Sequence, residues 1–152
     1  MATLEDAILL AVVSHQGQKE KNGTPYILHP IRVMGRVHTE AEKMVAILHD
    51  VVEDTGVTLE DLREKGFPPE VIAGVDAVSR RPDESYEEFI ERLKPNPIAR
   101  RVKIADIEDN MDIRRLDVLS ERDLERSRRY RESWESLTTL EKTEGDTTAW
   151  RI

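Results

Sequence analysis

The sequence predicts an all-α fold, a bundle of about seven or more helices. Apolar residues recur at spacings of three and four, and no segment alternates apolar and polar residues as a half-buried strand does. Most of the apolar runs are preceded by a Ser or Thr with an Asp or Glu three positions later. Such capping boxes mark helix starts, so they predict short helices separated by tight breaks.

Each helix has its own start signal. The first begins at the Thr3–Asp6 capping box and ends before Gly17. Pro30 suits the first position of the second helix, because its fixed φ is already helical. The later helices are expected to run from Thr39 to near Gly56, from Thr58 to Gly66, from Pro68 to the break at Arg80–Pro82, from Ser85 to Pro95 or Pro97, from Pro97 onward, and from Ser120 onward.

The segment His49-Asp50-Val51-Val52-Glu53-Asp54 carries the strongest functional pattern. At 3.6 residues per turn, its four polar side chains share one face of a helix. An acidic face on a helix can simply be solvated. The apolar run 44–48 before it favours a face that turns inward, where acids without a nearby Lys or Arg need a cation.

Two other segments supply further ligands for a metal ion. His29 stands at a helix entrance beside Pro30, and Asp106 faces the same way as Asn110, four residues later on another helix. Two imidazoles and two carboxylates leave coordination positions for water or substrate. This set suits an octahedral Mn²⁺, with Fe²⁺ or Ni²⁺ as alternatives, better than a closed zinc site. The predicted metal ligands are His29, His49, Asp50 and Asp106.

Four segments occur in an order and spacing that resemble a known family: His15–Gln18, Gly23–Pro30, Leu48–Thr55 and Lys103–Asn110. In them the sequence resembles the HD-domain phosphohydrolases, specifically the small alarmone hydrolases and the hydrolase domain of the bifunctional RelA/SpoT enzymes. The resemblance covers about residues 4–136 and implies an HD-domain helical bundle. It also implies a metal-dependent reaction of the stringent response, in which the 3′-diphosphate is removed from guanosine tetra- or pentaphosphate and pyrophosphate is released.

Catalytic and substrate-binding residues can be proposed around this metal site. Glu53 and Asp54 are the candidate catalytic pair, because neighbouring carboxylates separate each other's pKa values and can then act as acid and base. Asn110 can donate to a substrate oxygen. The resemblance places Lys21, Arg126 and Tyr130 at the substrate side. Weaker candidates for phosphate contacts are Lys19, Arg80, Arg81 and Lys103.

Two positions depart from the family pattern. Glu20 stands where the family has an arginine that lies against the nucleotide base, and Ile107 stands where a second arginine is expected. A carboxylate facing the base would remove a cation–π partner and repel phosphates. Glu20→Arg is therefore expected to raise kcat/KM for guanosine tetraphosphate roughly tenfold.

Length and composition predict one catalytic domain, residues 1–136, followed by a polar tail, residues 137–152, that contains Trp150. The chain has no cysteine and no apolar stretch that could span a bilayer, so we expect a cytoplasmic protein without disulfides or a membrane partner. A net charge of −8 disfavours nucleic acid and leaves a small phosphorylated nucleotide as the expected partner. The tail leaves a homo-oligomer open.

Two further functions remain open from the residues. One is an HD phosphohydrolase that acts on another small phosphorylated nucleotide, such as an adenine analogue or a dinucleotide 2′-phosphate. The other is a nucleotide sensor without turnover, which would have little reason to keep the Glu53–Asp54 pair. Of the remaining histidines, His38 is expected to lie exposed at a helix end, and His15 is expected to support the first loop by a hydrogen bond.

Overall fold

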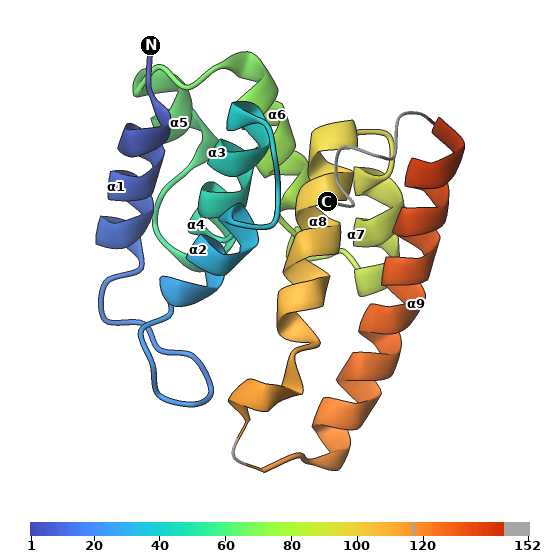
Figure 1. The fold of residues 1–152 in the computed structure, drawn as a ribbon. Coiled ribbons are helices and arrows are strands. Elements are labelled where there is room, and N and C mark those ends of the chain that lie inside the picture. Colours follow the sequence, from blue (N-terminus) through green and yellow to red (C-terminus); the bar gives the residue numbers. More distant parts are fainter. Residues whose placement is uncertain (117, 145–152) are drawn as a thin grey trace.

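The computed structural model describes residues 1–116 and 118–144, and this part of the chain confirms the all-α prediction. The described residues form no strand beyond one isolated bridge between Lys19 and Pro25. None of their helices is long and apolar enough to cross a membrane. In chain order the elements are α1 (Leu4–Ser14), α2 (Leu28–Met34), α3 (Glu40–Leu48), α4 (Val51–Asp54), α5 (Leu59–Glu64), α6 (Pro69–Val78), α7 (Tyr86–Leu93), α8 (Pro97–Asn110), the 3₁₀ helix η1 (Ile113–Arg115) and α9 (Glu121–Glu144) (Figure 1).

The predicted capping residues begin most of these helices. Thr3, Thr58 and Ser85 each form a reciprocal capping box with the acidic residue three positions later. The Ser120 hydroxyl likewise accepts from the Asp123 amide at 3.2 Å, directly before α9. Each such cap contributes about 1 kcal/mol, so the sequence signals correspond to real helix boundaries. Asn96, which caps α8, was not identified from the sequence.

The helix that was predicted to run from Thr39 to near Gly56 is interrupted. It ends as α3 at Leu48 and resumes as α4 at Val51. At the junction the His49 ring donates from Nδ1 to the Ala46 carbonyl oxygen at 2.6 Å, and the His49 amide approaches that oxygen only at 3.4 Å. A side chain that competes for a backbone acceptor disturbs the helical hydrogen-bond pattern. The prediction of one continuous helix is therefore wrong.

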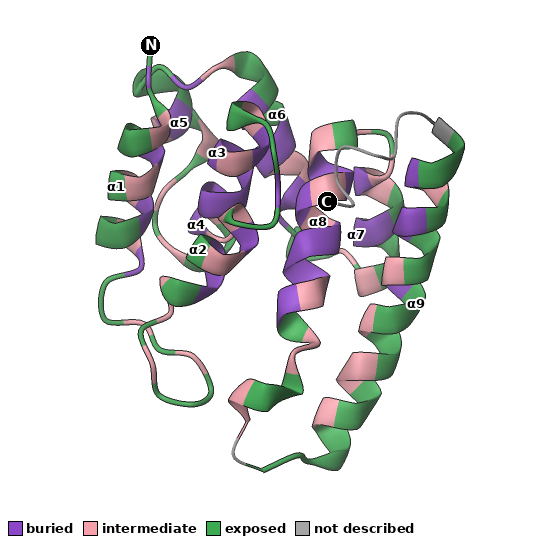
Figure 2. Cartoon of the chain, in the orientation of Figure 1, coloured by how far each residue is buried: buried purple, intermediate pink, exposed green. Residues whose placement is uncertain are grey.

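The core lies around α3, which packs against α1, α2, α6 and α8. Five consecutive residues of α3, Met44–Leu48, are buried, and the buried segments of these helices face inward in Figure 2. The approach of α6 to α3 requires a glycine, because a Cβ atom on Gly74 would lie 2.7 Å from a methyl carbon of Val45. This packing fixes the position of the junction that follows α3.

The last helix packs along α8 and extends past residue 136, where the sequence predicted the domain to end (Figure 1). Leu137 is fully buried, and Glu141 forms a buried ion pair with Arg100 at 2.7 Å. These contacts pack the first part of the predicted tail against the rest of the described fold. The remainder of that tail, residues 145–152 with Trp150, lies outside the described residues.

Candidate active site

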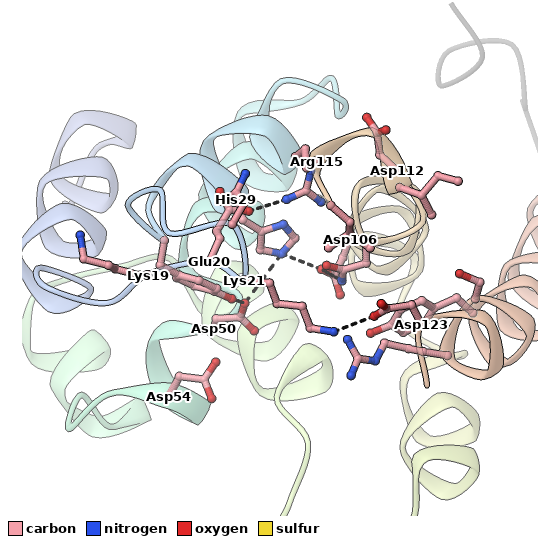
Figure 3. A pocket seen from close by; sticks show the side chains of 18 of the residues that line it. Lys19, Glu20, Lys21, His29, Asp50, Asp54, Asp106, Asp112, Arg115 and Asp123 are labelled. Carbon is pink, nitrogen blue, oxygen red and sulfur yellow. Dashed lines mark hydrogen bonds and ion pairs between the residues drawn. The ribbon is translucent and has the colours of Figure 1, made fainter. Parts of the chain in front are cut away.

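A pocket of about 410 Å³ lies where the loop after α1 meets α4, α8 and the start of α9 (Figure 3). Its volume is that of an ordinary small-molecule site. Nine of the ten predicted site residues line the pocket, and His49 is the one that does not. The predicted residues that line it are Lys21, His29, Asp50, Glu53, Asp54, Asp106, Asn110, Arg126 and Tyr130.

The four predicted metal ligands converge at one side of this pocket. Nε2 of His49 lies 3.0 Å from Oδ2 of Asp50 and 3.3 Å from Oδ1 of Asp106. Nε2 of His29 lies 2.9 Å from the same Asp106 oxygen and 3.9 Å from Asp50. Adjacent ligands of an octahedral ion with bonds of about 2.1 Å are about 3 Å apart, so the spacing fits a divalent cation.

The orientation of the two imidazoles also fits a cation. Nδ1 of His49 donates to the Ala46 carbonyl oxygen, which leaves Nε2 with a lone pair. This buried Nε2 has no hydrogen-bond partner. Nδ1 of His29 similarly faces Asp109, at 2.6 Å, so its Nε2 is directed at Asp106. Lone pairs and carboxylates that face one another need a positive charge between them.

The same carboxylates also favour protonation of the two imidazoles. Burial acts to lower the pKa of both imidazoles, but Asp106 near His29, and Asp50 and Asp106 near His49, outweigh it and raise each pKa above 6.5. Burial likewise acts to raise the pKa of Asp50, but the charge of His49 lowers it to about 2. Protons and a metal ion therefore compete for the same nitrogens.

Asp106 has two further partners on its own helix. Nζ of Lys103 lies 2.8 Å from Oδ2 of Asp106, and Nδ2 of Asn110 donates to Oδ1 at 3.0 Å. Lys103 is itself held over the rings of Tyr86 and Phe89, at 5.8 and 5.1 Å from their centroids. Asn110, which was predicted to donate to substrate, thus lies at the pocket but uses its amide to orient Asp106.

Glu53 and Asp54 remain close to the metal ligands although the helix is interrupted. Carboxylate oxygens of Asp50, Glu53 and Asp54 lie within 4.8 Å of one another. The Glu53 carboxylate accepts from the Arg80 backbone amide at 2.6 Å. Burial is the main cause that raises the pKa of Glu53 and of Asp54, and the charge of Asp50 adds to it. Carboxyls with raised pKa values beside a pocket suit proton transfer.

Tyr26 is a site residue that sequence analysis missed. Its hydroxyl donates to Oδ2 of Asp50, and its ring packs against those of His15 and His29, with centroids 5.1 and 5.7 Å away. Its sequence signals were its place in the segment Gly23–Pro30 and its position three residues before His29. Nδ1 of His15 bonds Gln18 Oε1 at 2.8 Å, which ties this ring to the loop after α1.

The predicted substrate side brings the loop after α1 opposite α9. Nζ of Lys21 lies 2.9 Å from a carboxylate oxygen of Asp123, and this pair crosses one side of the pocket (Figure 3). Arg126 and Tyr130, four residues apart on α9, line the same pocket. Of the weaker basic candidates, Lys19 and Lys103 also line it, whereas Arg80 and Arg81 do not.

Glu20 was expected to face the nucleotide base, and the structure gives it a different role. Its side chain is only 6% exposed, although it borders the pocket. The carboxylate pairs with Arg32 at 2.6 Å and Arg115 at 2.5 Å, and it accepts from the Thr24 hydroxyl at 2.9 Å. These pairings satisfy the carboxylate, so the prediction that Glu20 presents a free negative charge to the base is wrong.

Comparisons with known proteins show which proteins this chain resembles. A scan against family models gives no match. The chain is 42% identical to the guanosine-3′,5′-bis(diphosphate) 3′-pyrophosphohydrolase of Haemophilus influenzae over 76 residues, 47% of this chain and 11% of that protein. It is 32% identical to the GTP pyrophosphokinase of Myxococcus xanthus over 136 residues, 78% of this chain and 18% of that protein. The chain thus spans less than a fifth of these relatives.

The fold comparison covers almost the whole chain. A solved structure described as a metazoan ortholog of SpoT that hydrolyzes ppGpp aligns over 99% of this chain and 90% of its own, with a TM-score of 0.75 and 27% identity. The chain is therefore similar in sequence to alarmone hydrolases and shares the helical fold of the metazoan SpoT ortholog. This confirms the resemblance and the HD-domain fold that the sequence motifs predicted.

The second departure from the alarmone hydrolase pattern has a packing explanation. Ile107 is fully buried in the apolar core, one position after Asp106 on α8. Successive residues of a helix point about 100° apart, so a residue next to a pocket-facing aspartate can face the core. Ile107 thus contributes to packing and leaves the pocket without a side chain from this position.

We expect Glu20→Arg to destabilise the protein, in place of the gain in guanine use that the sequence suggested. The substitution would put a third guanidinium beside Arg32 and Arg115 and remove one of the two carboxylates that they share. Breaking a buried ion pair in this way costs about 3 kcal/mol of unfolding free energy. Urea denaturation measures the loss, with the exposed Lys19→Ala as control. A Glu20→Arg protein as stable as the wild type would contradict the pairing.

Proposed function

We propose that the protein is a metal-dependent hydrolase that removes the 3′-diphosphate from guanosine tetra- or pentaphosphate and releases pyrophosphate. The observation that carries the proposal is the convergence of two imidazoles and two carboxylates, with nitrogen–oxygen distances of 2.9 to 3.9 Å, at the side of a nucleotide-sized pocket. The activities named for the Haemophilus influenzae and metazoan relatives support this substrate class.

The donor set supports a single divalent ion, and among such ions it favours Mn²⁺, with Fe²⁺ or Ni²⁺ as alternatives. Mixed nitrogen and oxygen ligands with open positions are typical of octahedral first-row ions. The ion would polarise a phosphate oxygen and lower the pKa of a nearby water. The residues proposed to hold it are His29, His49, Asp50 and Asp106.

The residues around the metal ligands then divide the remaining tasks. The Arg80 amide holds one oxygen of Glu53, which leaves the other oxygen to orient the attacking water and to take its proton. Asp54 has a carboxylate oxygen within 4.8 Å of Glu53, a distance that a bridging water molecule spans for proton exchange. Lys21 and Arg126 bind the phosphates through their positive charge. When substrate binds, the Lys21 ammonium leaves its ion pair with Asp123 and pairs with a phosphate oxygen. Tyr130 offers a half-buried ring as a wall of the pocket.

A second candidate is the hydrolysis of another small phosphorylated nucleotide, such as an adenine analogue or a dinucleotide 2′-phosphate. The pairing of Glu20 with Arg32 and Arg115 favours it, because Glu20 already neutralises Arg115, the one of these two arginines that lines the pocket. A nucleotide sensor without turnover is less well supported. The Glu53 and Asp54 carboxylates lie within 4.8 Å of the proposed metal ligand Asp50, where a hydrolase needs proton-transfer groups and a sensor does not.

A substrate panel tests this proposal. The Mn²⁺-loaded protein is incubated with guanine and adenine nucleotides that carry a 3′-diphosphate and with a dinucleotide 2′-phosphate, and the products are separated by chromatography. We expect pyrophosphate and GDP or GTP from the guanine compounds, with His38→Ala, an exposed substitution, as active as the wild type. Cleavage of adenine compounds alone would establish the second candidate, and no cleavage of any compound would contradict both.

We expect the affinity for Mn²⁺ to rise with pH. Both imidazoles must be neutral to bind the ion, and their pKa values are raised above 6.5 by Asp50 and Asp106 against the opposing effect of burial. Below the raised pKa values protons occupy the site, and above them the nitrogens are free. Calorimetric titrations from about pH 6 to about pH 8 measure this dependence. An affinity that is constant or falls over this interval would remove the histidines from the proposed ligand set.

Three expectations from the sequence stay predictions. They are that the protein is cytoplasmic, that it has no nucleic-acid partner, and that it can form a homo-oligomer. We also propose that the HD domain reaches to the end of α9, since Leu137 and Glu141 are buried against the rest of the fold.

A further inference from the structure

Asp109 lies directly behind the proposed metal ligand His29. Its carboxylate oxygen Oδ2 is 2.6 Å from Nδ1 of His29, on the side of the ring opposite Asp106. Both side chains are buried, and that of Asp109 is only 1% exposed. Asp109 follows Asp106 by about one turn of α8, so one helix supplies a carboxylate to each ring nitrogen of His29.

Two arginines hold Asp109 in this position. Nε of Arg32 donates to Oδ1 of Asp109 at 2.8 Å, and Nη2 donates to Oδ2 at 3.1 Å, a bidentate arrangement. Arg115 donates to the Asp109 carbonyl oxygen at 2.6 Å and lies 3.4 Å from Oδ2. Without such partners, Asp109 would add a third buried negative charge close to Asp50 and Asp106.

Glu20 completes this group of charges. It pairs with both Arg32 and Arg115, so that two carboxylates face two guanidinium groups. Glu20 also belongs to the loop after α1, where its backbone amide donates to the Thr24 carbonyl oxygen at 2.8 Å. The loop that borders the pocket is thereby connected to His29 through side chains from α2, α8 and η1. We call Glu20, Arg32, Asp109 and Arg115 the support cluster.

The contact with Asp109 selects one form of the His29 ring. A neutral imidazole carries one N–H, and a carboxylate acceptor at hydrogen-bond distance keeps that hydrogen on Nδ1. Nε2 then keeps its lone pair directed at Asp106 and Asp50. A carboxylate behind a ligating histidine also makes the other nitrogen a stronger ligand, and loss of such a partner typically weakens metal binding tenfold to a hundredfold.

We propose that Asp109 is a positioning residue that fixes the tautomer and orientation of His29 for metal binding, and that Glu20, Arg32 and Arg115 hold Asp109 in place. This inference rests on the proposed function, because it assumes that His29 ligates the ion. It gives Glu20 a task within the metal site: the residue balances the two arginines that support a ligand.

Metal affinity tests the role of Asp109 independently of turnover. The experiment measures the Kd for Mn²⁺ in the wild type and in Asp109→Asn. The electron paramagnetic resonance signal of the unbound ion gives its free concentration. We expect Asp109→Asn to weaken binding about tenfold to a hundredfold. The control is Glu108→Gln, the neighbouring position on α8, whose side chain bonds Trp134 outside the pocket and whose Kd should stay within about twofold of the wild type.

A spectroscopic measurement separates positioning from a general loss of structure. The visible absorption of the Co²⁺-loaded protein reports the ligand geometry, and we expect it to change in Asp109→Asn while the circular dichroism of the metal-free protein stays that of the wild type. If Asp109→Asn does not fold, Glu20→Gln replaces it in the test. That variant removes the charge but keeps the shape and the Thr24 contact, and should weaken Mn²⁺ binding at least about threefold.

The outcomes separate this inference from the proposed function. A wild type that binds Mn²⁺ and an Asp109→Asn variant that is folded and binds it equally well would overturn the positioning role alone. If Asp109→Asn does not fold, an unchanged Kd in Glu20→Gln would overturn it. A wild type that binds no Mn²⁺ would overturn the metal site, and both proposals with it.

Discussion

Asp50→Asn should lose the metal ion and lower turnover at least about a thousandfold. The substitution removes one of the two carboxylates that face the imidazole nitrogens, 3.0 Å from His49 and 3.9 Å from His29. A neutral amide is a weaker ligand for a divalent ion than a carboxylate. The hydroxyl of Tyr26 also loses a charged acceptor. Metal content after dialysis and pyrophosphate release from guanosine tetraphosphate measure the two effects.

The matched control for this variant is Asp83→Asn, at an exposed aspartate in the segment between α6 and α7. It changes the net charge by the same amount and should leave both metal content and turnover unchanged. A dialysed Asp50→Asn protein that still contains one ion per chain and turns over at the wild-type rate would exclude Asp50 as a ligand.

Glu53→Gln should lower turnover about a hundredfold or more and leave the metal content near that of the wild type. The amide keeps the shape of the side chain and can still accept from the Arg80 backbone amide, but it cannot take a proton. The pKa of Glu53 is raised, mainly by burial, which makes its carboxylate a stronger base than an ordinary glutamate. Initial rates at saturating substrate and metal analysis of the same sample measure the result.

Glu60→Gln serves as the control, since Glu60 lies exposed on α5 and pairs only with the nearby Arg63 at 3.0 Å among the described residues. Its rate should equal that of the wild type. If Glu53→Gln retained most of the wild-type rate, proton transfer would belong to Asp54 or to bulk water, and Glu53 would have a structural role at the Arg80 amide.

Local signals made most of the fold predictable. The capping pairs at Thr3, Thr58 and Ser85 act between residues three positions apart, so the sequence contains both partners. The interruption at His49 depends on a competition between side chain and backbone for one carbonyl oxygen, which helical periodicity does not reveal. The extension of α9 depends on contacts such as Arg100 with Glu141, 41 residues apart.

In the candidate site, too, the residues within the sequence motifs could be predicted, and those that depend on long-range contacts could not. The family motifs contain the proposed ligands and the Glu53–Asp54 pair, so the sequence could bring these residues forward as a group. The support behind His29 was not accessible, because Asp109 is 80 residues away from it in the chain. Glu20 was misinterpreted for the same reason: its partners Arg32 and Arg115 lie 12 and 95 residues away. The sequence shows that Glu20 replaces the arginine of the family pattern. Only the three-dimensional structure shows that Glu20 pairs with Arg32 and Arg115.

Time-resolved ³¹P NMR of guanosine tetraphosphate tests the central proposal most directly, with the protein once loaded with Mn²⁺ and once stripped by a chelator. The loaded protein should convert the substrate into equimolar GDP and pyrophosphate, and the stripped protein should leave it intact until the ion is restored. Release of orthophosphate by the loaded protein, or equal conversion by the verified metal-free protein, would contradict a metal-dependent 3′-pyrophosphohydrolase.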